Sequence, residues 1–211
     1  GKAGYFGKMM EAPHYLAVVT KEGPGYLENS GYIMELMRMK AWELGLGTCW
    51  LSIQDESELK KILDVPDAER LTAFAAIGYP YTGIFKKDIS EKSSRLSIEE
   101  IVYLNQWNNP CTVEQLEQLG FANIVYFAKH APSYGNRQPW KLIVDHDKVF
   151  LTVLEDGKAD TGLDAGIMML YFEKASREEG ISGTWKIDVT PDFYQKYAVP
   201  SDYRIVGYYQ I

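Results

Sequence analysis

The sequence predicts an α+β fold, in which a mixed, mainly antiparallel sheet is flanked by helices and built from two related halves. Short β-branched runs alternate with longer stretches whose apolar residues recur at helical spacing. Two of the strand-like runs, 140–145 and 148–154, meet at Asp147-Lys148, which suits a tight hairpin turn and therefore an antiparallel pair. Several motifs of the first half also recur, in the same order, in the second half.

The recurrence has a constant spacing. The segment 31–34 (GYIM) precedes 166–169 (GIMM) by 135 positions, and 45–50 (GLGTCW) precedes 180–185 (GISGTW) by the same 135. A Val-Pro pair and a strand ending in Gly-Tyr then follow in both halves. The shared order favours an internal duplication.

In the first half, glycines and a proline separate the expected elements. Gly23-Pro24-Gly25 ends the first strand, Ser30 is the expected cap of the first helix, and Gly45 is its expected end. Residues 82–96 are charged and rich in Ser, which predicts an excursion over the surface. The expected elements are a buried strand at 15–20, a helix at 30–44, an extended segment at 48–52, a helix at 56–63 and a strand at 72–78.

In the second half, capping signals fix two helix starts. Thr112 and Gln115 have capping-box spacing and open one helix that continues to Ala128, and Asp164 is the expected cap of another. The expected elements are a helix at 98–104, the capped helix, strands at 140–145 and 148–154, a helix at 165–179 and strands at 184–189 and 203–210. We expect the two halves to span 1–108 and 109–211 and to form one compact unit together.

Composition narrows the class of protein. The 211 residues are 46% apolar and 24% charged, which is ordinary for a soluble globular protein. A net charge of −7 argues against general nucleic-acid binding, and the sequence holds no apolar run long enough for a membrane span. Two cysteines without a CxxC pair and three scattered histidines argue against a metal site and suit a reducing, cytoplasmic setting. Because the chain begins in a loop-like stretch without an initiator Met, we expect an N-terminal part to be missing.

The densest group of polar side chains lies in a turn at 131–140 (APSYGNRQPW). Ser133, Asn136, Arg137 and Gln138 fall within six positions, and two prolines and a glycine constrain the backbone around them. Such a turn suits a polar planar ligand. Two interpretations of Asn136 stay open, because its amide could contact a ligand or satisfy the backbone of the turn itself.

These motifs together resemble the FMN-dependent nitroreductase family. The first half is similar to the later part of such a chain, with an Ala-Pro pair before a Val-rich strand, then GLGTCW at 45–50, IGYP at 77–80 and the basic pair Lys92 and Arg95 before a helix. The second half supplies the turn at 131–140. The resemblance covers most of the chain and is nearest to a branch of putative nitroreductases in which two related halves share one chain.

The resemblance implies FMN as the cofactor and NAD(P)H as the electron donor. Ordinary members are homodimers with the flavin at the subunit interface, so a fused duplicate implies an internal pseudo-dimer, as a monomer or a homodimer. No residue is expected to be catalytic in its own right, because the flavin carries the chemistry. The implied cofactor-binding residues are Trp50, Leu51 and Ser52 with Thr48 as a further possibility, Pro132, Ser133, Asn136 and Gln138, the phosphate-binding Lys92 and Arg95, and Arg137 as an alternative phosphate or nicotinamide contact.

The implied activity is a ping-pong transfer of electrons to a small-molecule acceptor, namely a nitroaromatic, a quinone or a free flavin. The alternative is a non-catalytic module that binds flavin or another planar ligand, and a third interpretation is a structural pseudo-enzyme. The sequence departs from the family in one respect: nothing in residues 1–211 matches the Arg-Ser-x-Arg motif that clasps the flavin phosphate.

Purely structural interpretations stand beside the functional ones. Trp50 and Trp140 suit aromatic positions at the rim of a core, and Cys49 suits a small buried apolar residue. Lys92 and Arg95 lie in a charged run of a kind that is usually a solvated face. Only the resemblance makes these two cations candidates for binding a ligand.

Overall fold

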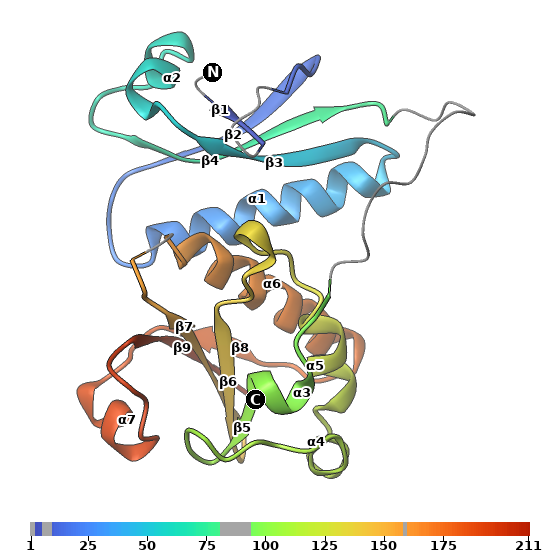
Figure 1. Ribbon diagram of the computed structural model, residues 1–211. Coiled ribbons are helices and arrows are strands. Elements are labelled where there is room, and N and C mark those ends of the chain that lie inside the picture. Colours follow the sequence, from blue (N-terminus) through green and yellow to red (C-terminus); the bar gives the residue numbers. More distant parts are fainter. Residues whose placement is uncertain (1–2, 6–9, 81–93, 158–159) are drawn as a thin grey trace. The chain divides into compact units, whose positions relative to one another are not determined.

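The computed structural model describes residues 3–5, 10–80, 94–157 and 160–211, which form two compact units, 1–91 and 92–211 (Figure 1). The two halves were expected to meet at 108/109 and to form one compact unit. That boundary falls inside the second unit, because strand β5 (Val102–Leu104) pairs with β6 (Trp140–Asp145). None of the helices described is both long and apolar enough to cross a membrane.

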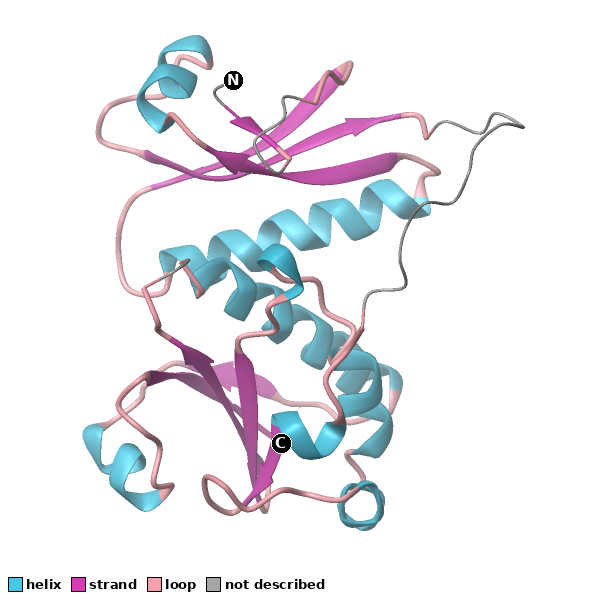
Figure 2. Cartoon of the chain, viewed as in Figure 1, coloured by secondary structure: helices cyan, strands magenta, loops and turns pink. Residues whose placement is uncertain are grey.

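The first unit is a four-stranded antiparallel sheet with the strand order β1-β3-β4-β2. The central strand β4 is buried along most of its length, because strands flank it on both edges and α1 packs on it. Helix α1 runs along one face of the sheet (Figures 1 and 2). The elements are β1 (Ala3–Gly4), β2 (His14–Thr20), α1 (Tyr26–Glu43), β3 (Gly47–Ile53), α2 (Glu56–Ile62) and β4 (Arg70–Gly78).

Helix α1 begins four residues before the expected cap at Ser30. Its N-cap is Gly25, whose left-handed φ of 71° a glycine adopts without strain. Ser30 is fully buried inside the helix, where its hydroxyl donates to the Tyr26 carbonyl at 2.6 Å and accepts from the Thr72 hydroxyl at 2.8 Å. The predicted cap was therefore wrong, because this serine joins the helix to β4.

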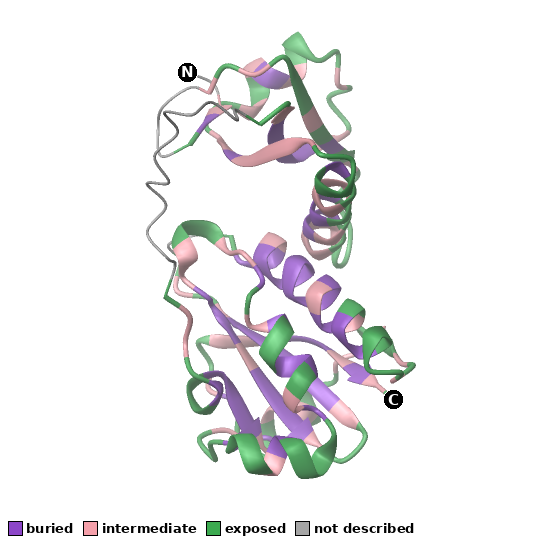
Figure 3. Cartoon of the chain, turned by 90° about the vertical axis from the view of Figure 1, so that its right-hand side faces the viewer, coloured by how far each residue is buried: buried purple, intermediate pink, exposed green. Residues whose placement is uncertain are grey.

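The second unit is a five-stranded mixed sheet with the order β5-β6-β7-β9-β8, in which only β5 and β6 run parallel. Helix α6 packs on one face, and α7 covers the other face with an aromatic cluster around Phe150. Buried residues concentrate in α6 and the central strands (Figure 3). The remaining elements are α3 (Ile98–Ile101), α4 (Val113–Leu119), α5 (Ala122–Ala128), η1 (Tyr134–Asn136), β7 (Lys148–Leu154), α6 (Gly162–Glu178), β8 (Thr184–Lys186), α7 (Pro191–Lys196) and β9 (Tyr203–Gln210).

The hairpin strands at 140–145 and 148–154 match the prediction, but three helices differ from it. The expected helix at 98–104 stops at Ile101, after which the chain becomes strand β5. The capping box at Thr112 is present, yet the helix it opens ends at Gly120, whose φ of 78° breaks it in two. Helix α6 begins before Asp164, so this residue lies in the first turn and is not the cap.

The two units share one topology over five elements. Five elements of the first unit have a counterpart that begins 135 residues later, to within two residues. In chain order, β2, α1, β3, α2 and β4 correspond to β7, α6, β8, α7 and β9. In both sheets the last strand of the series lies between the other two, in the orders β3-β4-β2 and β8-β9-β7. The two matching tryptophans also behave alike, since the Trp50 indole donates to Glu35 of α1 and the Trp185 indole donates to the Met169 carbonyl of α6. The repeated order supports the predicted duplication.

We predict that Gly207→Ala destabilises the second unit by about 1–3 kcal/mol, because overpacking a rigid site costs that much. An added Cβ would lie 2.4 Å from the Lys186 carbonyl oxygen of the neighbouring strand, and a backbone atom cannot move aside cheaply. Denaturant unfolding measures the loss. Gly23→Ala is the control, because its methyl group would meet nothing within 4 Å. Equal stability of the two variants would contradict the close approach.

Candidate functional site

The turn at 131–140 has an unusual backbone. Gly135, Asn136 and Gln138 all take left-handed φ values, of 57°, 56° and 49°. Such conformations cost free energy for residues other than glycine and persist only where surrounding contacts impose them. One such contact lies within the turn, where the Ser133 hydroxyl accepts from the Gln138 backbone N–H at 2.9 Å.

A segment some forty residues earlier supplies the other contacts. The Asn136 amide donates to the Ser94 carbonyl at 2.9 Å and accepts from the Arg95 guanidinium. The Gln138 side chain accepts from the Leu96 N–H at 3.0 Å and donates to Ser94 at 3.3 Å. The structure thus brings together Ser133, Asn136, Gln138 and Arg95, while Lys92 lies outside the described residues. The Asn136 amide therefore bonds segment 94–95 rather than the backbone of its own turn, which was one of its two interpretations.

Arg95 is the cation of this cluster. Its guanidinium donates to Asn136 and to the His130 carbonyl, the latter at 3.1 Å, so two of its five N–H groups are committed. No carboxylate of the described residues forms an ion pair with it. Burial lowers the pKa of Arg95, and the Tyr171 hydroxyl opposes this shift. A half-buried guanidinium without a carboxylate partner is suited to an anionic ligand.

Two acidic side chains accept hydrogen bonds from residues of the turn. The Asp164 carboxylate accepts from the Tyr134 N–H at 3.0 Å, and Arg137 donates to Asp156 at 2.7 Å. Burial raises the pKa of Asp164 to about 6. Arg137 thus has an acidic partner, whereas Arg95 has none among the described residues.

In the first unit, the GLGTCW motif forms β3 and packs against α1. The Trp50 indole donates to the Glu35 carboxylate at 2.8 Å, and Arg38 bonds the same carboxylate at 2.5 Å. Arg38 also donates to the Thr48 hydroxyl at 3.1 Å. Glu35 is only 4% exposed, so this acid and its donors form a buried network. The side chains of Thr48 and Trp50 are thereby engaged with the helix, as the structural interpretation of Trp50 expects.

Strand β3 is paired along both edges. β4 pairs with one edge from Gly47 to Leu51, and among the described residues β1 pairs with the other edge at Ser52 and Ile53. Cys49 lies on this strand, and burial raises the pKa of its thiol, which disfavours the reactive thiolate.

Sequence reasoning missed Glu35, Arg38 and the contact of Asp164 with the turn. Glu35 lies one helical turn after Gly31, on the same face as buried residues of α1. An acid at a buried helical position must have partners, and this signal could have indicated a link to the following motif. The partner of Asp164 could not be read from the sequence, because it lies 30 residues away.

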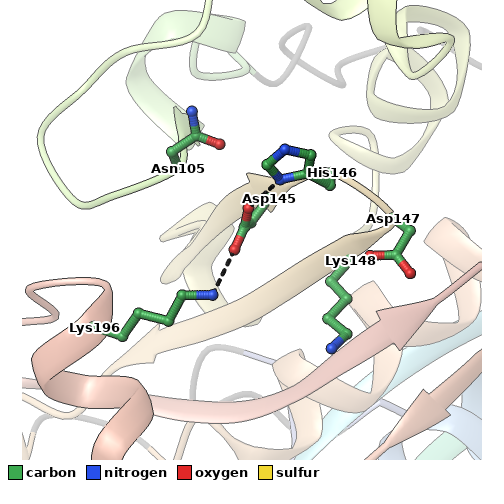
Figure 4. Close-up of a pocket in the computed structure, with 6 residues that line it drawn as sticks. All are labelled: Asn105, Asp145, His146, Asp147, Lys148 and Lys196. Atoms are coloured by element: carbon green, nitrogen blue, oxygen red, sulfur yellow. Dashed lines mark hydrogen bonds and ion pairs between the residues drawn. The ribbon is translucent and has the colours of Figure 1, made fainter.

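A separate hollow of about 530 Å³ lies at the tip of the β6–β7 hairpin and contains none of the predicted site residues (Figure 4). Its central acid, Asp145, accepts from His146, Lys196 and Tyr197 at 2.6–2.8 Å. Burial opposes the ionisation of Asp145, yet these donors hold its pKa well below the usual range, and the hydrogen bond to Asp145 raises the pKa of Lys196. The donors around Asp145 thus offset the cost of burying its charge, and we interpret the cluster as structural. Across the described ranges, no group of three or more His, Cys, Asp or Glu residues could hold a metal ion.

We predict that Glu35→Ala destabilises the first unit by about 2–3 kcal/mol, because it leaves the Trp50 and Arg38 donors without their acceptor in a largely buried place. Glu35→Gln keeps an acceptor and should cost less. Thermal or denaturant unfolding provides the measurement. A loss below 0.5 kcal/mol for Glu35→Ala would show that the network contributes little.

Comparisons with known proteins agree with the motifs. The chain resembles the structure of a putative nitroreductase from Thermotoga maritima, with a TM-score of 0.62 and 18% identity over 94% of this chain and 70% of that one, which shows a shared fold. A nitroreductase family protein from Clostridium novyi NT is 26% identical over 47% of this chain and 54% of that one, at a TM-score of 0.31. No curated protein sequence matches the chain. The family model described as "Putative TM nitroreductase" matches residues 2–176. Because this match covers most of the chain, the protein belongs to the putative TM nitroreductase family.

Proposed function

We propose that the protein is an FMN-dependent oxidoreductase that uses NAD(P)H to reduce a nitroaromatic, a quinone or a free flavin. One observation carries the proposal most directly. The Arg95 guanidinium is held at the turn by Asn136 and His130 and meets no carboxylate of the described residues, as an anion-binding group requires. Family membership supports the same conclusion.

The donor groups suit the parts of FMN. Arg95 provides charge-assisted bonds for the phosphate, and we keep Lys92 as its proposed neighbour. Pro132 and Ser133 would pack against and bond one edge of the flavin ring. On β3, Trp50, Leu51 and Ser52 are the proposed contacts for the edge that carries N5 and O4, and the donors would be those of their N–H groups that point away from β4. The chemistry that FMN supplies is acceptance of a hydride and delivery of electrons to the acceptor.

Asn136 and Gln138 take a different role from the one first expected. Their amides bond Ser94, Arg95 and Leu96, so they fix the segment that carries the cation. This arrangement pre-organises Arg95, since less side-chain entropy is lost when a ligand binds a group that is already held. We therefore propose that both residues act on the cofactor through Arg95.

We further propose that the two related halves of the chain form an internal pseudo-dimer. The repeated topology supports this, because a duplicated chain could form internally the interface that homodimeric relatives form between subunits. The protein would then be a monomer with an internal pseudo-dimer, or a homodimer of such chains.

A non-catalytic flavin-binding module is the second candidate. It is favoured by the commitment of both turn amides to the protein backbone, which leaves few polar side chains to orient a substrate. NADPH oxidation in the presence of menadione separates the two. The oxidoreductase turns over the donor when FMN is bound, and the module does not.

We predict that Arg95→Gln weakens FMN binding by about 10- to 100-fold, because a lost charge-assisted bond is worth about 1.5–3 kcal/mol. Riboflavin, which lacks the phosphate, should bind the variant and the parent protein alike. Quenching of flavin fluorescence measures both affinities.

Arg177→Gln is the matched control, because this arginine lies on α6, is 62% exposed and pairs with Glu173. Equal losses for FMN and riboflavin would place Arg95 away from the phosphate. Absence of FMN binding by the parent protein would overturn the proposed function itself.

A further inference from the structure

Asp164 is a buried acid whose contact lies in the turn. It belongs to the first turn of α6, and its side chain is 5% exposed. Its carboxylate accepts from the Tyr134 N–H at 3.0 Å. This N–H belongs to the residue between Ser133, a proposed flavin contact, and Gly135, the first residue with a left-handed φ. Asp164 therefore fixes the backbone where the strained part of the turn begins.

The surroundings of Asp164 raise the pKa of its carboxyl group towards neutral pH. Burial is the largest influence and raises its pKa to about 6, and the like charge of Asp160 acts in the same direction. The Tyr134 N–H and the charge of Arg137 oppose the rise. Arg137 is itself paired with Asp156, which reduces its pull on Asp164. The position in the first turn of α6 also favours the anion.

The two ionisation states of such a group hold the turn differently. A hydrogen bond to a carboxylate is shorter and about twice as strong as one to a neutral carboxyl group. Ionisation of Asp164 therefore tightens the contact with Tyr134. A turn with three left-handed residues depends on such contacts to keep its conformation.

We propose that Asp164 is a positioning residue that makes the conformation of the turn at 133–138 depend on pH, so that its ionised form holds the turn ready for the ligand. The ligand part of this inference rests on the proposed flavin function. The structural part, the coupling of Asp164 to the turn, does not need a flavin.

The sign of the stability effect follows from linkage. Because the pKa of Asp164 is raised from the 3.8 of a free Asp to about 6, the folded protein keeps a proton that the unfolded chain loses in this range. The contribution of Asp164 to stability is complete below pH 4, falls as pH rises towards 6, and is constant above it. Asp164→Asn should remove this decline. The ionised state thus costs overall stability while it fixes the turn locally.

Nuclear magnetic resonance of the full chain without ligand tests the coupling. We expect the Tyr134 amide signal to titrate with a midpoint near pH 6, together with the carboxyl carbon of Asp164. In Asp164→Asn the amide should not titrate. Asp160→Asn, the matched control, should keep the titration and lower its midpoint, because it removes a neighbouring like charge.

An amide of Tyr134 that stays unchanged from pH 5 to 7.5, or that titrates without the carboxyl carbon of Asp164, would overturn the inference. The comparison of these two signals in the parent protein needs no variant, so it decides the question even if Asp164→Asn does not fold.

Flavin affinity tests the consequence for the ligand. We expect FMN to bind more weakly at pH 5 than at pH 7.5, and the decrease to be smaller in Asp164→Asn, where the FMN phosphate, with a second pKa of about 6, still titrates. Linkage is reciprocal, so FMN binding should in turn shift the titration of Asp164. If FMN binds the ionised form tenfold more tightly than the protonated form, bound FMN lowers the titration midpoint of the Asp164 carboxyl group by one pH unit. Equal affinity of the parent protein at both pH values would overturn the inference and leave the proposed function standing. If FMN binds at neither pH, the proposed function fails, and the amide titration alone decides the role of Asp164.

Discussion

The bonds between segment 94–96 and the turn are the constraint on which the candidate site depends. Asn136 and Gln138 hold the backbone of Ser94 and Leu96, and this places Arg95 beside the turn. Without these bonds, a guanidinium in a charged and Ser-rich stretch would be an ordinary solvated side chain. With them, it becomes a pre-organised cation beside Asn136 and His130. The same bonds account for the left-handed backbone of the turn, which needs outside contacts to persist.

The first unit shows the same principle with different chemistry. A buried acid of α1, Glu35, takes the indole N–H of Trp50 and the guanidinium of Arg38. The side chains of Thr48 and Trp50 thereby face the helix. In each unit, an ionised side chain is thus held in place by hydrogen bonds with a neighbouring segment.

The sequence predicted what depends on local patterns and missed what depends on distant partners. The strands at 140–145 and 148–154 were exact, because apolar, β-branched runs joined by a short turn are local signals. The chain near Ile101 was taken as helix, because the pairing of β5 with β6 is invisible in that stretch alone. The grouping of Ser133, Asn136 and Gln138 was found from their spacing. The bonds of Asn136 and Gln138 to 94–96 were not, since no local pattern relates segments so far apart.

The central claim is that Arg95, held beside the turn, binds the phosphate of FMN, and amide chemical shifts during titrations with FMN and with riboflavin test it most directly. The account predicts that FMN shifts the amides of 94–96 and of 133–136 with one dissociation constant, and that riboflavin, which lacks the phosphate, leaves the amides of 94–96 unchanged. Shifts of 94–96 that are equal for both ligands, or that are absent with FMN, would contradict it.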